Sequence, residues 1–279
     1  MPAIPFPIPD FLYGTAWKEE RTESLIELAL RAGFRGIDTA NQRRHYYEAA
    51  VGRGLASAYQ DGIVTRSDVF LQTKFTYRAG QDHRLPYDPS ESFGKQVEQS
   101  LSSSLEHLRT DYVDSFVLHG PASGRGWTES DVEVWEAMVR EQEKGRTRFL
   151  GVSNISQAQL RHMFAVHSVL PTFVQNRCFA RLGWDREVRI CCAAHNMIYQ
   201  GFSLLTANVE VVHHPLVAAI AERAHATPAQ VIFSFARRIG MLPLTGTSNP
   251  EHMRQDLQAL QLTLTEEQSA SIEYLTSAH

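Results

Sequence analysis

Short apolar or β-branched runs alternate along this chain with longer stretches in which apolar residues recur at helical spacing. The runs occupy residues 11–17, 35–40, 69–75, 113–119, 148–154, 172–176, 197–202 and 241–246. Helical patterns lie between or after them, at 20–33, 47–59, 92–108, 130–145, 156–167, 185–195, 215–240 and 250–260. Strict strand-then-helix alternation favours parallel strands joined by crossover helices, so the pattern predicts an α/β protein.

The number of repeats narrows the architecture. Eight strand-helix units close a (β/α)8 barrel, and 279 residues are close to the roughly 250 typical of that fold. An open, doubly wound sheet is the alternative, but a G-x-G-x-x-G fingerprint follows none of the runs. The sequence therefore predicts a single-domain TIM barrel over residues 1–279.

Composition excludes several partner classes. The 27 basic and 31 acidic residues are well mixed and give a net charge of -4, so no basic stripe predicts nucleic-acid binding. No apolar stretch reaches the length of a membrane span. The spacing of the 3 cysteines indicates neither a disulfide framework nor a metal site; they are Cys178, Cys191 and Cys192. We expect a monomeric cytoplasmic protein that holds no metal.

Polar residues end most of the predicted strands, where a (β/α)8 enzyme carries its chemistry. They are Asp38, Lys74, His119, Ser153, Asn154, Gln175, Tyr199 and Thr245. Each one alone has an ordinary explanation: a helix cap, a turn residue, a surface side chain or a core contact. Together they predict one polar pocket above the barrel.

The elements GIDTA, LQTK, FVLH and GVSN, with Gln175 and Tyr199, resemble the aldo-keto reductase superfamily from about residue 11 to residue 260. Members of that superfamily are NAD(P)H-dependent carbonyl reductases on a (β/α)8 barrel. The resemblance implies a catalytic tetrad, and Asp38, Lys74 and His119 match three of its members.

The tyrosine of the tetrad is harder to place, because this chain has about two extra residues between Ala40 and Val51. Counting the family spacing forward from Asp38 ends near Arg43, and counting it back from Val51 ends at His45. We assign the role to Tyr46, and we interpret Tyr47 as a packing residue at the start of the next helix. Such a tyrosine would protonate the carbonyl oxygen. We expect Lys74 to lower its pKa, Asp38 to hold Lys74, and His119 to orient the carbonyl.

The resemblance also implies a nicotinamide cofactor, NADPH or NADH. Ser153, Asn154 and Gln175 match the hydrogen bonders of the nicotinamide carboxamide, and Tyr199 matches the aromatic residue that stacks on the ring. By the same resemblance, Gly201, Phe202, Ser203 and Leu204 match the positions where the pyrophosphate-covering loop of the family begins, although YQGFSLL departs from its usual proline-rich form.

At the last strand the sequence departs from the family. Many members grip the 2'-phosphate of NADPH with a lysine and an arginine, where this chain has Leu244 and His252. The remaining candidates for phosphate and adenosine binding are Thr245, Thr247, Ser248, Arg254, Gln255 and Asp256, together with the N-terminus of the following helix.

For the substrate pocket we expect Trp17, His45, the long loop 76–92, Cys178, Phe179 and Trp184, which together favour a neutral, moderately hydrophobic aldehyde or ketone. Two other functions compete with carbonyl reduction. A barrel that binds nucleotide without turnover would act as a sensor or accessory subunit, and a redox-neutral isomerase or lyase would use Tyr46 and Lys74 on a bound carbonyl compound.

Overall fold

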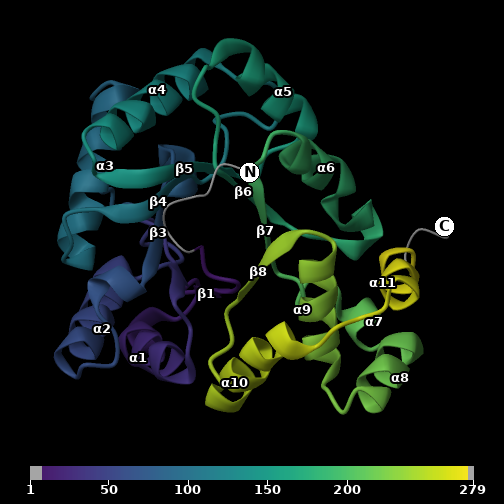
Figure 1. The fold of residues 1–279 in the computed structure, drawn as a ribbon. Coiled ribbons are helices and arrows are strands. Elements are labelled where there is room, and N and C mark those ends of the chain that lie inside the picture. Colours follow the sequence, from purple (N-terminus) through teal and green to yellow (C-terminus); the bar gives the residue numbers. More distant parts are fainter. Residues whose placement is uncertain (1–7, 276–279) are drawn as a thin grey trace.

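The computed structural model describes residues 8–275 and contains a closed barrel of parallel strands in the order β1 to β8, surrounded by helices (Figure 1). The strands are β1 (Leu12–Gly14), β2 (Gly36–Asp38), β3 (Phe70–Phe75), β4 (Val113–Leu118), β5 (Thr147–Ser153), β6 (Phe173–Arg177), β7 (Ile198–Phe202) and β8 (Met241–Thr245). Each lies within one of the predicted runs or one residue beyond it, and the (β/α)8 barrel is confirmed.

The helices cover the outside of the barrel (Figure 1). They are α1 (Thr22–Ala32), α2 (Glu48–Gln60), α3 (Phe93–Leu108), α4 (Glu129–Glu143), α5 (Gln157–Val166), α6 (Arg186–Ala194), α7 (Val209–Val212), α8 (Pro215–Arg223), α9 (Pro228–Arg238), α10 (Pro250–Gln258) and α11 (Glu266–Glu273). Short 3₁₀ turns lie at Glu19–Arg21, Arg66–Asp68, Arg78–Gly80, Ala180–Asp185 and Ala259–Gln261.

The single helix predicted over 215–240 is in fact two helices, α8 and α9. Pro228 occupies the first turn of α9, where its missing N–H costs nothing, and Thr227 caps that turn together with Gln230. A proline and a capping box in the middle of a periodic stretch are therefore the local reason for the break.

Alternation along the strands sorts side chains between the barrel interior and the helices. Leu12, Phe70, Phe173 and Leu242 form a small apolar cluster separate from the main core. Two residues further along three of these strands come Gly14, Gln72 and Gln175, so the interior changes from apolar to polar toward the carboxyl ends. The other face of each strand packs against the helices in the main hydrophobic core.

Candidate active site

A cavity of about 1010 Å³ lies at the carboxyl ends of the strands, at the top of the volume range of small-molecule sites. Its wall includes these predicted residues: Trp17, Asp38, His45, Tyr46, His119, Ser153, Gln175, Ser203, Leu204, Thr245, Thr247, His252, Gln255 and Asp256. The strand ends therefore do converge on one pocket.

Asp38 and Lys74 form a buried ion pair at this cavity. Lys74 Nζ donates to Asp38 Oδ1 over 2.6 Å and to the carbonyl oxygen of Thr39 over 2.8 Å, and the Lys74 side chain is only 1% exposed. Burial lowers the pKa of the Lys74 ammonium, while the Asp38 carboxylate acts in the opposite direction. Such a pair is costly to break from one side, because the remaining charge would be buried without a partner.

Tyr46 lies above this pair, and Tyr47 does not. Lys74 Nζ is 5.3 Å from the centroid of the Tyr46 ring, and Tyr46 lines the cavity. Tyr47 is the residue before α2, and the guanidinium of Arg43 stacks on its ring at 4.1 Å, outside the cavity lining. The geometry therefore offers the hydroxyl of Tyr46 to a ligand.

The electrostatics of Tyr46 differ from the expectation that Lys74 lowers its pKa. Burial and the nearby Asp38 carboxylate raise the pKa of the Tyr46 phenol. The physical reason is that burial removes the phenol from water, while Lys74 directs its bonds to Asp38 and Thr39 and the Asp38 carboxylate opposes ionisation of the phenol. At neutral pH Tyr46 is a protonated hydroxyl that can donate a hydrogen bond.

His119 faces Tyr46 across the cavity floor, with ring centroids 5.9 Å apart in an edge-to-face arrangement. Burial, with the positive Lys74 nearby, lowers the pKa of His119 to about 3, so the imidazole is neutral. Its Nδ1 lies 2.7 Å from Thr76 Oγ1. When the Thr76 hydroxyl donates to Nδ1, the proton of the neutral ring resides on Nε2, which can then donate.

The residues predicted to bind the carboxamide do not all line the cavity. Gln175 and Ser153 line the cavity, whereas Asn154 does not. Asn154 has a left-handed backbone, with φ at 53°, and its Nδ2 donates to the carbonyl oxygen of His119 over 2.8 Å and to Ser153 Oγ over 3.1 Å. Asn154 therefore holds its loop against His119, outside the cavity lining.

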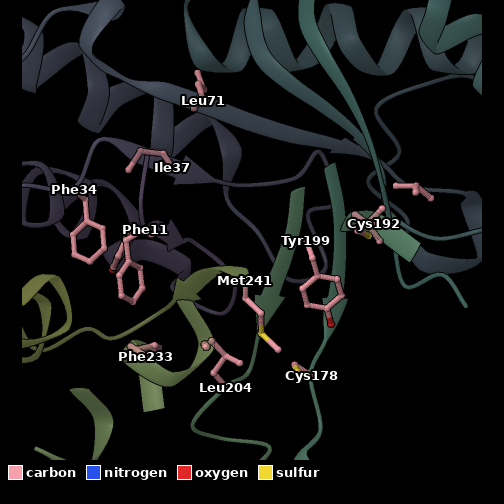
Figure 2. Packing of buried hydrophobic residues seen from close by; sticks show 14 of the residues in the cluster. Phe11, Phe34, Ile37, Leu71, Cys178, Cys192, Tyr199, Leu204, Phe233 and Met241 are labelled. Atoms are coloured by element: carbon pink, nitrogen blue, oxygen red, sulfur yellow. The ribbon is translucent and has the colours of Figure 1, made fainter. Parts of the chain in front are cut away.

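Tyr199 is not placed to stack on a ligand, in contrast to the sequence-based assignment. It is 1% exposed, lies among core residues beside Cys178 and Met241 (Figure 2), and donates its hydroxyl to Asp185 Oδ2 over 2.8 Å. Along β7 the interior positions are Gln200 and Phe202, so Tyr199 and Gly201 point to the helices. Phe202 is the aromatic residue of β7 that lines the cavity, together with Ser203 and Leu204.

The segment after β8 supplies a polar wall. Thr245, Thr247, His252, Gln255 and Asp256 line the cavity. Two further predicted residues lie outside the lining: Ser248, and Arg254, which is paired with Glu251 on the exposed face of α10. Thr245 Oγ1 donates to Asp256 Oδ2 over 2.8 Å, and burial raises the pKa of Asp256 to about 6.

Trp17 and His45 form the aromatic part of the cavity mouth. Their ring centroids are 4.0 Å apart, and the Trp17 side chain is 68% exposed. The backbone of Trp17 is left-handed, with φ at 62°, a conformation that non-glycine residues rarely adopt. Burial lowers the pKa of His45, with Arg44 adding to the effect, so this ring pair carries no charge at neutral pH.

The other predicted pocket residues lie elsewhere. Cys178 and Trp184 are fully buried in the main core, and Trp184 packs edge-on against Phe235 with ring centroids 4.9 Å apart. Phe179 is outside the cavity lining, beside the guanidinium of Arg181 at 5.0 Å. No residue of the loop 76–92 lines the cavity, because this loop packs against Phe75 of β3 and against residues 41–42 after β2. Tyr87 donates to the carbonyl oxygen of Thr76 over 2.8 Å.

Two cations in the cavity wall were missed from the sequence. Lys18 follows β1, and its Nζ donates to the carbonyl oxygen of Gly246 beside β8. Arg177 ends β6, and its Nε lies 3.3 Å from Ser203 Oγ. Within residues 8–275 neither side chain forms a salt bridge with a carboxylate. Arg177 stands two residues after Gln175 on the same strand face, and this spacing is a signal that could have identified it.

Two other kinds of site were sought in the part of the chain that the structure describes. There, no group of three or more His, Cys, Asp or Glu side chains is arranged to hold a metal ion. Among the same residues, no helix is both long and apolar enough to span a bilayer.

Comparison with known proteins agrees with this architecture. Residues 12–209 match the model of the aldo/keto reductase family. An aldo-keto reductase of Mycolicibacterium vanbaalenii is 30% identical over 92% of this chain and 84% of its own length. The crystal structure of an aldo/keto reductase from Brucella melitensis has a TM-score of 0.80 at 25% identity, covering 96% of this chain and 95% of its own.

A Bombyx mori aldo-keto reductase, solved in complex with NADP, shares the fold with a TM-score of 0.79 at 22% identity, over 95% of this chain and 88% of its own. The family match and the mycobacterial relative extend over most of this chain, and the barrel agrees with them. This chain belongs to the aldo/keto reductase family.

Proposed function

We infer that the protein is an NAD(P)H-dependent reductase that converts an aldehyde or ketone to the alcohol, with Tyr46 as the general acid. The observation that carries this proposal is the arrangement at the cavity floor. There Tyr46 and His119 lie edge to face at 5.9 Å, with the Lys74 ammonium 5.3 Å from the Tyr46 ring and ion-paired to Asp38.

Tyr46 suits the role of acid because its phenol remains protonated. Its raised pKa means that the hydroxyl can donate a hydrogen bond to a carbonyl oxygen throughout the physiological range. As negative charge grows on that oxygen, the phenolic proton moves to it and a phenolate remains. The Lys74 ammonium then lies beside a full negative charge and stabilises it until the phenol regains a proton from solvent.

Asp38 and His119 position this reaction. Asp38 keeps Lys74 oriented through the 2.6 Å contact and balances its charge in a dry environment. The neutral His119 ring offers a second donor for the carbonyl oxygen when Thr76 holds its Nδ1. Two donors that meet at one oxygen fix the orientation of the carbonyl carbon.

The cavity wall fits a nicotinamide dinucleotide. Gln175 uses both of its N–H groups on protein acceptors, and no described residue donates to its oxygen, which leaves that oxygen for a carboxamide N–H. Phe202 offers an apolar ring surface, and Lys18 and Arg177 offer positive charge for the pyrophosphate. When bound, a reduced nicotinamide supplies the hydride.

The substrate site is the mouth formed by Trp17 and His45. Two uncharged rings in tilted contact beside the Tyr46 hydroxyl favour a carbonyl compound that carries an apolar or flat substituent and no charge near the carbonyl.

A direct assay tests the proposal. Purified protein is mixed with NADPH or NADH and a panel of neutral aldehydes and ketones, and absorbance at the nicotinamide band is followed. The proposal predicts aldehyde-dependent oxidation of the cofactor with equimolar alcohol. Cofactor binding without consumption across the panel would favour the nucleotide-binding alternative, and conversion of a carbonyl compound without cofactor would favour the isomerase or lyase.

A further inference from the structure

Below the cavity floor, three glutamines and Asp38 form a polar layer inside the barrel. Gln72 of β3 and Gln200 of β7 are both fully buried, and neither lines the cavity. Their amides pair reciprocally across the barrel: Gln72 Nε2 donates to Gln200 Oε1 over 2.8 Å, and Gln200 Nε2 donates to Gln72 Oε1 over 3.0 Å.

This amide pair is joined at both sides to the site. Gln72 Nε2 also donates to Asp38 Oδ1 over 2.7 Å. Gln175 Nε2 donates to the same Asp38 Oδ1 over 3.0 Å and to Gln200 Oε1 over 2.9 Å. Asp38 is paired with Gln72 in the strand register, and Gln175 is paired with Gln200, so the network connects opposite walls of the barrel.

The carboxylate fixes the direction of every amide in the network. An ionised carboxylate only accepts, so Gln72 must turn its nitrogen toward Asp38 and its oxygen toward the Gln200 nitrogen. Gln200 then presents its oxygen to Gln175, which donates its nitrogen both to this oxygen and to Asp38 Oδ1. The amide of Gln175 is thereby held with its oxygen directed away from the network, and Gln175 is the only one of the three glutamines that lines the described cavity.

We propose that Gln72 and Gln200 are positioning residues: their cross-barrel amide bridge, together with Asp38, orients the Gln175 side chain as a hydrogen-bond acceptor, so that the cavity selects a ligand bearing an N–H₂ donor at this point. The inference rests on the proposed function for the identity of that ligand, a nicotinamide carboxamide. Gln72 and Gln200 act only through Gln175 and Asp38, because neither reaches the cavity.

The test compares binding of NADP⁺ with that of its 3-acetylpyridine analogue, in which an acetyl group replaces the carboxamide and no N–H₂ remains. Dissociation constants come from calorimetry, so no turnover is required. Wild type should prefer NADP⁺ by about fivefold, the worth of one hydrogen bond. Gln200→Met, which keeps the volume and removes the amide, should reduce this preference to less than about twofold.

A double-mutant cycle distinguishes positioning from a structural role. In a Gln175→Met background the preference is already lost, so adding Gln200→Met should change it no further. Ser115→Ala is the matched control: Ser115 is buried and pairs with Gln72 in the register, and its hydroxyl has no hydrogen-bond partner. This control should keep the wild-type preference. If Gln200→Met does not fold, Gln72→Met tests the same bridge from its other end, with the same expected loss.

The outcomes separate the two proposals. Retained preference in both bridge variants, or equal weakening of both nucleotides, would overturn the positioning role while leaving the proposed function in place. A wild-type protein that binds neither of these nucleotides, and neither NAD⁺ nor its 3-acetylpyridine analogue, would overturn the proposed function and this inference together.

Discussion

Asp256→Asn should stabilise the protein at neutral pH and have little effect in acid. Asp256 is 3% exposed and accepts a hydrogen bond from Thr245 over 2.8 Å, which an asparagine oxygen can also accept. Burial raises the pKa of its carboxyl from 3.8 to about 6, against the opposing effects of Thr245 and His252. The folded state therefore favours the protonated acid over the carboxylate.

The sign and size follow from linkage. A raised carboxyl pKa costs nothing below the unfolded value, and the cost grows as the pH rises from about 4 to about 6. At about 1.4 kcal/mol per pKa unit, the shift of Asp256 corresponds to about 3 kcal/mol above pH 6 and about 1 kcal/mol at pH 4.5. Asparagine carries no such charge, so Asp256→Asn should gain these amounts.

Thermal unfolding at pH 4.5 and pH 8 measures the effect. For a chain of this size the gain corresponds to an increase in Tm of about 5 °C at pH 8 and about 2 °C at pH 4.5. Asp111→Asn, at an exposed position, is the control and should change Tm at neither pH. An equal shift of Tm at both pH values, or a loss of stability at pH 8, would refute the reasoning from burial.

Two further predictions concern the cofactor and the packing of the helices. Leu244→Lys introduces a cation into the wall after β8 and should raise the preference for NADPH over NADH by about fivefold in calorimetric titrations, whereas Leu244→Met should not; an unchanged ratio would place the 2'-phosphate elsewhere. Gly52→Ala should lower the free energy of unfolding by about 2 kcal/mol, because its Cβ would lie 1.9 Å from the backbone oxygen of His107 on α3. Denaturant titration checks this, with Gly124→Ala in open space as the control, and wild-type stability of the Gly52 variant would contradict the packing.

The barrel could be predicted because strand and helix periods follow from local sequence. Each strand is a short apolar run, and caps such as Thr128 with Asp131 at the start of α4 are written in neighbouring residues. The same local rules explain the split between α8 and α9, since Pro228 and the capping box of Thr227 and Gln230 begin a new helix inside the periodic stretch.

The site residues could be predicted where they lie at the end of a strand. They were harder to predict where a difference of one position determines whether a side chain faces the barrel interior or the helices. Asp38, Lys74 and His119 lie at or next to strand ends, and the structure gathers them at the cavity floor. The assignment of Tyr199 as the stacking residue was wrong because a shift of one position along a strand moves a side chain from the barrel interior to the helices. Phe202 is the aromatic residue of β7 on the interior face.

Long-range electrostatics were beyond sequence reasoning. The pKa of Tyr46 depends on its burial and on which charges the Asp38 and Lys74 pair leaves unbalanced, and these are properties of the assembled barrel. The glutamine network likewise joins strands β3, β6 and β7, whose residues are far apart in the chain. Neither the pKa of Tyr46 nor the glutamine network corresponds to a local sequence motif.

The central claim is that the Tyr46 hydroxyl delivers the proton to the carbonyl oxygen, and the most direct measurement is the turnover of Tyr46→Phe with a reducible aldehyde, beside cofactor affinity measured separately. The account predicts a decrease in kcat of about 10²- to 10⁴-fold with an unchanged Kd for NADPH, and near wild-type kcat for Tyr47→Phe. Full activity of Tyr46→Phe with intact cofactor binding would contradict it.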